Sequence, residues 1–96
     1  MSRYIHLVNW TDAGIKAVSN SAERLDQARE LVRKEGGELK EFYLTMGRYD
    51  MVVFSEAEDE TAVARSMLKL GQGGAIRSET FRAFTEKEYR AIIASL

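Results

Sequence analysis

The chain contains no cysteine and no proline, and its only histidine is His6. Without cysteine it can form no disulfide framework and offers no thiolate chemistry, which favours a cytoplasmic protein. A single histidine and no cysteine also argue against a transition-metal site, because such a site draws several ligands from these two residue types. We therefore expect no metal and no cofactor.

The chain also lacks a strong charge of one sign and a long hydrophobic run. Its 14 basic residues are balanced by 15 acidic ones, and the net charge of −1 gives no general attraction to nucleic acid or to an anionic membrane. No apolar stretch approaches the roughly 18 residues that span a bilayer, and the N-terminus has no signal-peptide core. We expect neither nucleic acid nor a membrane as a partner.

No catalytic motif stands out in the sequence. It has no nucleophile elbow, no Walker loop and no serine–histidine–aspartate arrangement. The glycine-rich residues 71–74 superficially resemble a phosphate loop, but they leave a predicted helix and enter a predicted strand, whereas a phosphate loop leads into a helix N-terminus. We therefore nominate no catalytic residue and lean towards a protein that is not an enzyme.

The sequence does contain a regular alternation of strand and helix patterns, within a length suited to one domain, residues 1–96. β-rich runs alternate with apolar helical stripes in the order β-α-β-β-α-β. The predicted strands are residues 4–9, 38–45, 49–54 and 75–83. A three-residue turn at 46–48 makes the middle two strands a hairpin, and residues 11–18 form a turn or a short helix.

Helix boundaries are indicated by capping residues and glycines. Asn20 with Glu23 has the spacing of a capping box, and the helix that follows ends at Gly36-Gly37. The second helix starts at an acidic cluster, residues 56–60, where negative charge is favoured by the helix dipole. Its predicted buried face comprises Val63, Ala64, Met67, Leu68 and Leu70.

This order predicts an α+β protein of the ferredoxin-like type. Right-handed crossovers place both main helices on one face of a four-stranded antiparallel sheet. The other face stays open, yet alternation puts apolar groups on both sides, since Ile5 and Leu7 point away from Tyr4, His6 and Val8. An open face of roughly 400 Å² is near the upper limit for soluble monomers. We therefore expect a homo-oligomer, at least a dimer, formed through that face.

A predicted C-terminal helix offers a competing explanation for how the open face is covered. Thr85 with Glu88 has the spacing of a capping box, which would start this helix. Its apolar positions follow helical spacing and could fold back onto the sheet. These positions are Tyr89, Ile92, Ile93 and Leu96.

Several stretches of the sequence resemble one known family. The run from Phe42 to Asp50, FYLTMGRYD, resembles the signature of the GYD domain family, which is named for a Gly-x-Tyr-Asp element. The opening from Tyr4 to Asp12 and residues 80–85 are similar to that family as well, so the matches cover nearly the whole chain. The resemblance implies a small stand-alone prokaryotic protein with a ferredoxin-like fold of the dimeric α/β-barrel type. It implies no biochemical activity, because the family is uncharacterised.

Two interpretations fit the polar residues of the hairpin. Tyr49 and Asp50 could form a polar pair beside a ligand pocket, with Gly47 allowing close approach of the backbone. Alternatively, Gly47 supplies the positive φ that the turn requires, and Asp50 binds the backbone or Arg48. We favour this structural interpretation.

Similar alternatives exist for the other candidate residues. On the open sheet face His6 could be a general base, because its ordinary pKa is near 6.5, but a partly buried, hydrogen-bonded structural histidine is the commoner case. Arg82 could bind an anion through its forked donors, while alternation puts Arg77 on the opposite face. The usual outcome for such arginines is an ion pair, here with Glu79, Glu41 or Asp50.

Two hypotheses about function follow. The preferred one is a non-catalytic oligomeric module that binds a small ligand or a partner at the sheet face. The alternative is a cofactor-independent enzyme of the dimeric α/β-barrel kind, a monooxygenase or an isomerase, with acid and base groups around an apolar cavity. In either case the candidate ligand-binding residues are His6, Tyr43, Tyr49, Asp50 and Arg82.

Overall fold

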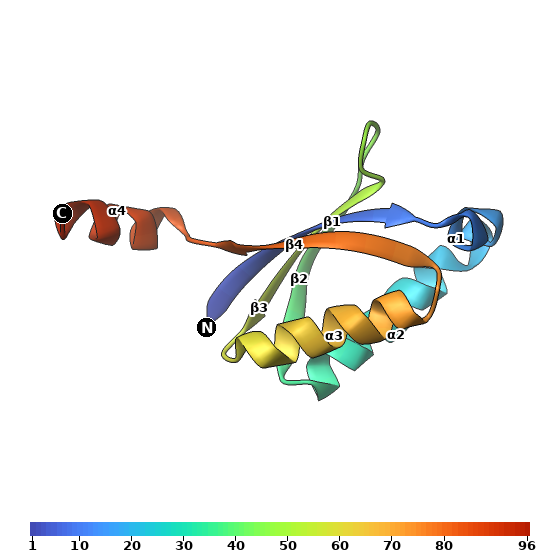
Figure 1. The fold of residues 1–96 in the computed structure, drawn as a ribbon, viewed down its shortest axis with the longest axis horizontal. Coiled ribbons are helices and arrows are strands. Elements are labelled where there is room, and N and C mark those ends of the chain that lie inside the picture. The colour runs from blue at the N-terminus through green and yellow to red at the C-terminus, as the bar shows by residue number, and fades with distance from the viewer.

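The computed structural model describes residues 1–96, which form one four-stranded antiparallel sheet, a layer of helices and a projecting C-terminal helix (Figure 1). The strand order is β2-β3-β1-β4, as expected for a ferredoxin-like α+β protein. The elements are β1 (Ser2–Trp10), α1 (Asp12–Lys16), the 3-10 turn η1 (Val18–Asn20), α2 (Ser21–Lys34), β2 (Gly37–Leu44), β3 (Met51–Ala57), α3 (Glu60–Gln72), β4 (Ile76–Ala83) and α4 (Glu86–Ala94). None of the helices combines the length and the apolar composition of a membrane span.

The register of the central strand β1 decides which side chains face the helices. His6 lies opposite Val53 of β3 and Thr80 of β4, and residues directly opposite one another share a face. The alternate residue Ile5 lies opposite Phe54 and therefore points to the other side. The buried residues of β1 and β3 all belong to the set that faces the helices: Tyr4, His6, Val8, Met51, Val53, Ser55 and Ala57.

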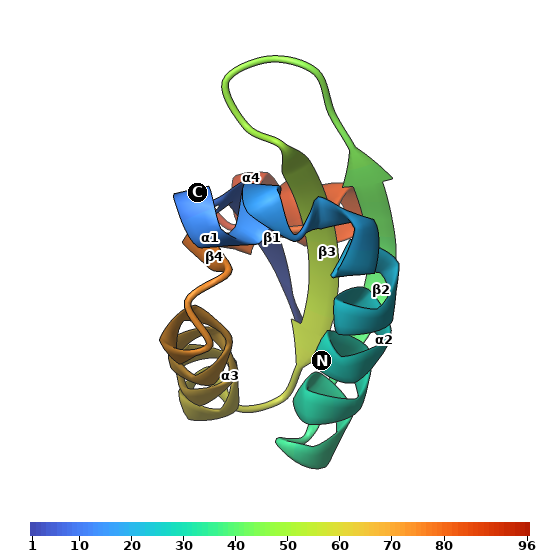
Figure 2. The same cartoon turned by 90° about the vertical axis from the view of Figure 1, so that its right-hand side faces the viewer.

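The loop between β2 and β3 is longer than predicted. β3 begins at Met51 rather than at residue 49, so residues 45–50 form a loop that projects from the end of the sheet (Figure 2). A register shift between Leu39 and Glu41 leaves one extra residue in β2. Such a bulge changes the face on which later side chains point, and it keeps both Leu39 and Phe42 on the helix side.

Helices α2 and α3 cover one face of the sheet, but two details differ from the sequence-based expectation. The Asn20 side chain makes no capping hydrogen bond, so the predicted capping box of α2 does not form. In α3 the buried residues are Ala62, Val63 and Ser66, whereas Leu68 is 75% exposed. Ala64 is exposed as well. The helix is rotated from the predicted apolar stripe because its small residues pack closest to the sheet.

The apolar core between these layers is divided into two small clusters. One joins Tyr4, Ala57 and Val63, and the other joins Val8, Met51 and Val53. No large side chain is completely buried. The helix layer therefore leaves space above the middle of the sheet, and this space is the candidate site described below.

Helix α4 projects away from the rest of the chain and does not fold back over the open sheet face (Figure 1). Thr85 and Glu88 form the predicted capping box, which explains why the helix starts there. Its apolar residues are exposed. The projection gives a radius of gyration of 14.4 Å, compared with about 12.5 Å for a compact chain of this length. The open face is thus not covered by its own chain.

Candidate functional site

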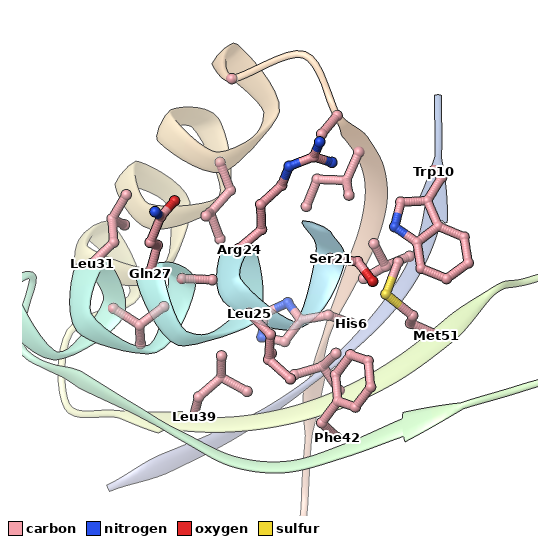
Figure 3. Close-up of a pocket in the computed structure, with 18 of the residues that line it drawn as sticks. His6, Trp10, Ser21, Arg24, Leu25, Gln27, Leu31, Leu39, Phe42 and Met51 are labelled. Carbon is pink, nitrogen blue, oxygen red and sulfur yellow. The ribbon is translucent and has the colours of Figure 1, made fainter. Parts of the chain in front are cut away.

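A cavity of about 810 Å³ lies between α2, α3 and the sheet (Figure 3). This volume is within the range of small-molecule binding sites. Leu25 and Leu31 line it from α2, while Leu39, Phe42 and Met51 line it from the strands (Figure 3). Eighteen of its 26 lining residues are hydrophobic, and none is aspartate or glutamate. The cavity is therefore suited to an apolar molecule and offers no carboxylate for acid–base chemistry.

His6 lies on the floor of this cavity and not on the open face of the sheet. Its Nε2 is 2.7 Å from Ser55 Oγ and its Nδ1 is 2.9 Å from Thr80 Oγ1. The residue is only 4% exposed, and burial lowers the pKa of the imidazole to about 4. At neutral pH His6 is an uncharged ring whose two nitrogens already have hydroxyl partners. The expected open-face location is wrong, whereas the structural interpretation of His6 agrees with these contacts.

Arg24 of α2 also lines the cavity, although it is not among the candidate residues predicted from the sequence. The side chain extends from α2 towards the α3–β4 side of the cavity (Figure 3). Its Nη2 donates a hydrogen bond of 3.4 Å to the Ala17 carbonyl, while its Nη1 is buried and has no partner. A signal existed in the sequence, because Arg24, Ala28 and Leu31 follow the i, i+4, i+7 spacing of one helix face.

The opposite face of the sheet carries a second feature, an uncovered apolar surface that we call the open face. Tyr43 belongs to it and not to the cavity, and its ring packs edge-on against Phe54 with a centroid separation of 6.2 Å. Direct pairing places the other members beside them. The apolar residues of the open face are Ile5, Leu7, Tyr43, Val52, Phe54 and Phe81.

The hairpin residues serve the fold of the loop. The Asp50 carboxylate accepts a hydrogen bond of 3.0 Å from the Trp10 backbone N–H, which confirms the structural interpretation of this aspartate. Gly47 has a φ of +145°, the conformation that favours glycine. The Tyr49 hydroxyl donates to Glu79 Oε1 at 3.2 Å and ties the loop to β4. Neither Tyr49 nor Asp50 lines the cavity.

Arg82 occupies the end of β4 and is engaged locally. Its guanidinium lies 4.3 Å from the centre of the Phe84 ring and forms an ion pair of 3.6 Å with Glu88. The expected partners Glu79, Glu41 and Asp50 are not the ones that it uses, because it lies on the helix side of the sheet near the start of α4. The backbone N–H of the α4 N-cap residue holds the pKa of Glu88 below its usual value.

The five nominated residues therefore do not meet in one pocket. His6 lines the cavity, Tyr43 lies on the open face, Tyr49 and Asp50 hold the hairpin, and Arg82 lies at the start of the projecting helix. Alternation along the strands separates the first two, because successive side chains point to opposite faces. What the fold does provide is one cavity on the helix side and one apolar surface on the other.

An α+β sheet of this order with one uncovered face defines a small ferredoxin-like protein. Comparison with known proteins makes the assignment more specific, because the GYD domain matches residues 4–93 and the chain belongs to the GYD domain family. It is also similar to a protein of Thermus thermophilus called glutamine synthetase and cystathionine beta-lyase binding protein. The two are 36% identical over 84 residues, which cover 86% of this chain and 88% of the relative.

Proposed function

We propose that this protein self-associates, at least into a dimer, through the open face and that the assembly binds other proteins, among them metabolic enzymes of the kind named for its relative. The observation that carries the proposal is the open face, an apolar surface that neither the helix layer nor α4 covers. The relative's name supports protein partners for the family. A cytoplasmic location is part of the same proposal.

The distribution of side chains on the open face has the pattern of a protein interface. Apolar groups occupy its middle, and charged groups surround them, such as Arg3 and Glu56, which form an ion pair of 3.0 Å. Glu79 and Arg77 lie on the same face along β4. An apolar centre with a charged rim is typical of specific association, because the centre gains from desolvation while the rim stays hydrated.

The size of the interface suggests a role for α4. Two paired faces would remove roughly 800 Å² from water, which is below the about 1,200–2,000 Å² of stable complexes. Helix α4 adds exposed apolar residues and starts directly after β4, an edge strand of the sheet. We propose that α4 packs against the second copy and supplies the remaining area. The exposed apolar residues available for this contact, in α4 and directly on either side of it, are Phe84, Tyr89, Ile92, Ile93 and Leu96.

Once the open face is occupied, the hairpin loop is the best candidate for binding another protein. It projects beyond the sheet (Figure 2), and the Met46 side chain is 100% exposed at its tip. The loop is held in shape because Thr45 Oγ1 donates to the Tyr49 carbonyl at 2.6 Å and Tyr49 in turn contacts Glu79. A preordered loop loses little conformational entropy on binding, which favours its use as a docking element.

The proposal is tested by measuring association with glutamine synthetase and with cystathionine β-lyase purified from the same organism as this chain. Either enzyme is immobilised, and binding of the wild-type protein is followed by biolayer interferometry. We expect saturable binding to at least one enzyme, and a loss of at least about tenfold in affinity for Met46→Glu, because a charge would be buried at the contact. The matched control is Leu68→Glu, another exposed apolar position, which lies on α3.

Two results count against this function. If the wild-type protein binds neither enzyme at high concentration, the proposed class of partner is wrong. If Met46→Glu binds the enzyme as tightly as the wild type and Leu68→Glu do, the hairpin loop is not the docking element.

The enzyme hypothesis has less support from the arrangement of side chains. A general base at neutral pH needs a free nitrogen and a pKa near the working pH. Burial lowers the pKa of His6 to about 4, and both ring nitrogens lie within hydrogen-bonding distance of hydroxyl groups. The nominated tyrosines and Asp50 are outside the cavity that His6 lines. A binding role accounts for these features more simply.

A further inference from the structure

The cavity combines an apolar lining with one cationic group that lacks a counterion. Arg24 has a buried Nη1 without a hydrogen-bond partner, and it forms no ion pair. A buried polar atom of this kind carries a cost until a partner is supplied. The only other cation at the cavity, Lys69, already forms an ion pair with Glu35. One positive charge therefore remains available to a ligand.

We propose that this cavity binds a monocarboxylate with an apolar body, whose carboxylate pairs with the guanidinium of Arg24 while its hydrocarbon part fills the space between α2 and the sheet. Guanidinium and carboxylate are geometrically matched, and the pair is stronger away from water. The site is independent of the proposed protein partner, because neither the open face nor the hairpin tip lines the cavity.

The charge balance of the cavity favours a single negative charge. A dicarboxylate or a phosphate dianion would bring a second charge that no free cation offsets. An amino acid would bring an ammonium group, and the cavity has no aspartate or glutamate to receive it. His6 adds no charge because it is neutral at pH 7. The charges of the cavity therefore restrict the ligand to a monoanion, which the cavity volume alone would not do.

The polar groups on the floor of the cavity favour an apolar ligand body, because they already bind one another. The imidazole of His6 is already matched by Ser55 and Thr80, so it presents no unsatisfied donor or acceptor to the ligand. A hydroxylated body would lose its bonds to water without gaining new ones here. Beside this floor the wall formed by Leu25, Phe42 and other apolar side chains is suited to hydrocarbon (Figure 3).

The probe that tests this proposal is dodecanoate, used below its micelle concentration. Trp10 lines the cavity and is the only tryptophan of the chain, so its fluorescence reports on occupancy. We expect saturable binding of dodecanoate and at least about tenfold weaker binding by Arg24→Gln, because the charged pair is lost. The matched control is Arg29→Gln, which removes an exposed arginine of the same helix that does not line the cavity.

Further arms separate charge from hydrophobic binding and locate the site. Dodecanol has the same chain without the charge, and its affinity should be the same for the wild type and Arg24→Gln. Ala28→Phe should weaken dodecanoate binding at least tenfold by filling the cavity, and circular dichroism shows whether the variant is folded. A dicarboxylate, 2-oxoglutarate, tests the expected preference for a single negative charge. The proposal is overturned if binding of dodecanoate to the wild type does not saturate, or if Arg24→Gln and Arg29→Gln bind dodecanoate with the same affinity. It is also overturned if 2-oxoglutarate binds more tightly than dodecanoate.

Discussion

Acidification provides a quantitative test of the burial of His6 between the sheet and the helices. In the folded chain the imidazole has a pKa of about 4, compared with 6.5 for an unperturbed histidine. Between these two values the unfolded state binds more protons than the folded state, so the free energy of unfolding falls as the pH falls. The contribution is complete above pH 6.5 and is lost as the pH approaches 4.

The size of the effect follows from the same two values. A separation of about 2.5 pH units corresponds to about 3 kcal/mol over the whole window. Between pH 7 and pH 5 the part contributed by His6 is about 2 kcal/mol. Stopping at pH 5 keeps the carboxylates out of the measurement, because ion pairs and hydrogen bonds hold the pKa values of Glu35 and Glu56 below their usual 4.5.

Urea unfolding followed by Trp10 fluorescence provides the assay, with wild type and His6→Gln compared at pH 7 and at pH 5. Protein concentration is held fixed, because dissociation of an oligomer would also affect the transition. The wild type should lose about 2 kcal/mol on acidification, and His6→Gln, which does not titrate, should lose less than about 0.5 kcal/mol. Equal losses in the two proteins would refute the assignment of His6 as a buried neutral ring.

Three further predictions concern contacts that hold the connections between the helices and strands. Gly14→Ala should lower the free energy of unfolding by about 3 kcal/mol, because the added Cβ would lie 2.0 Å from the backbone carbonyl oxygen of Ala75 in the α3–β4 connection. The control is Gly71→Ala, where the added Cβ meets open space. Urea unfolding measures both variants. Thr85→Ala should weaken α4 by about 1 kcal/mol, seen as faster amide exchange in that helix while the exchange of the sheet is unchanged. Asp50→Ala should lower the free energy of unfolding by about 1.5–3 kcal/mol, because the Trp10 N–H loses its charged acceptor. The control is Glu58→Ala, which removes an exposed carboxylate. A loss no larger than that of the control would show that the Asp50 bond is unimportant.

The sequence was sufficient to predict the order of the elements and the uncovered sheet face. Alternation in β1 correctly separated Ile5 and Leu7 from His6 and Val8, and the Thr85 capping box formed as expected. The alternation could not show which of these two sets of side chains faces the helices, because the two sides of a sheet with two apolar faces give the same pattern. His6 was therefore assigned to the wrong face.

The candidate site was less predictable because its residues come from different elements. Arg24 is on α2, and its unpaired Nη1 becomes evident only once α2 is placed against the sheet. The bulge in β2 likewise cannot be seen in the alternation pattern alone, although it determines that Phe42 faces the cavity. In α3, hydrophobicity suggested that Leu68 is buried, but close packing was achieved by the small residues Ala62 and Ser66.

If the open face joins two copies of this chain, as we propose, the molar mass of the protein in solution is that of at least two chains. Sedimentation equilibrium should give at least twice the chain mass of 10.9 kDa. Phe54→Glu, which places a charge in the middle of the open face, should shift the protein to the mass of one chain, whereas Leu68→Glu on α3 should leave the assembly intact. A wild-type protein that sediments as a single 10.9 kDa chain at high concentration would show that the open face does not join two copies.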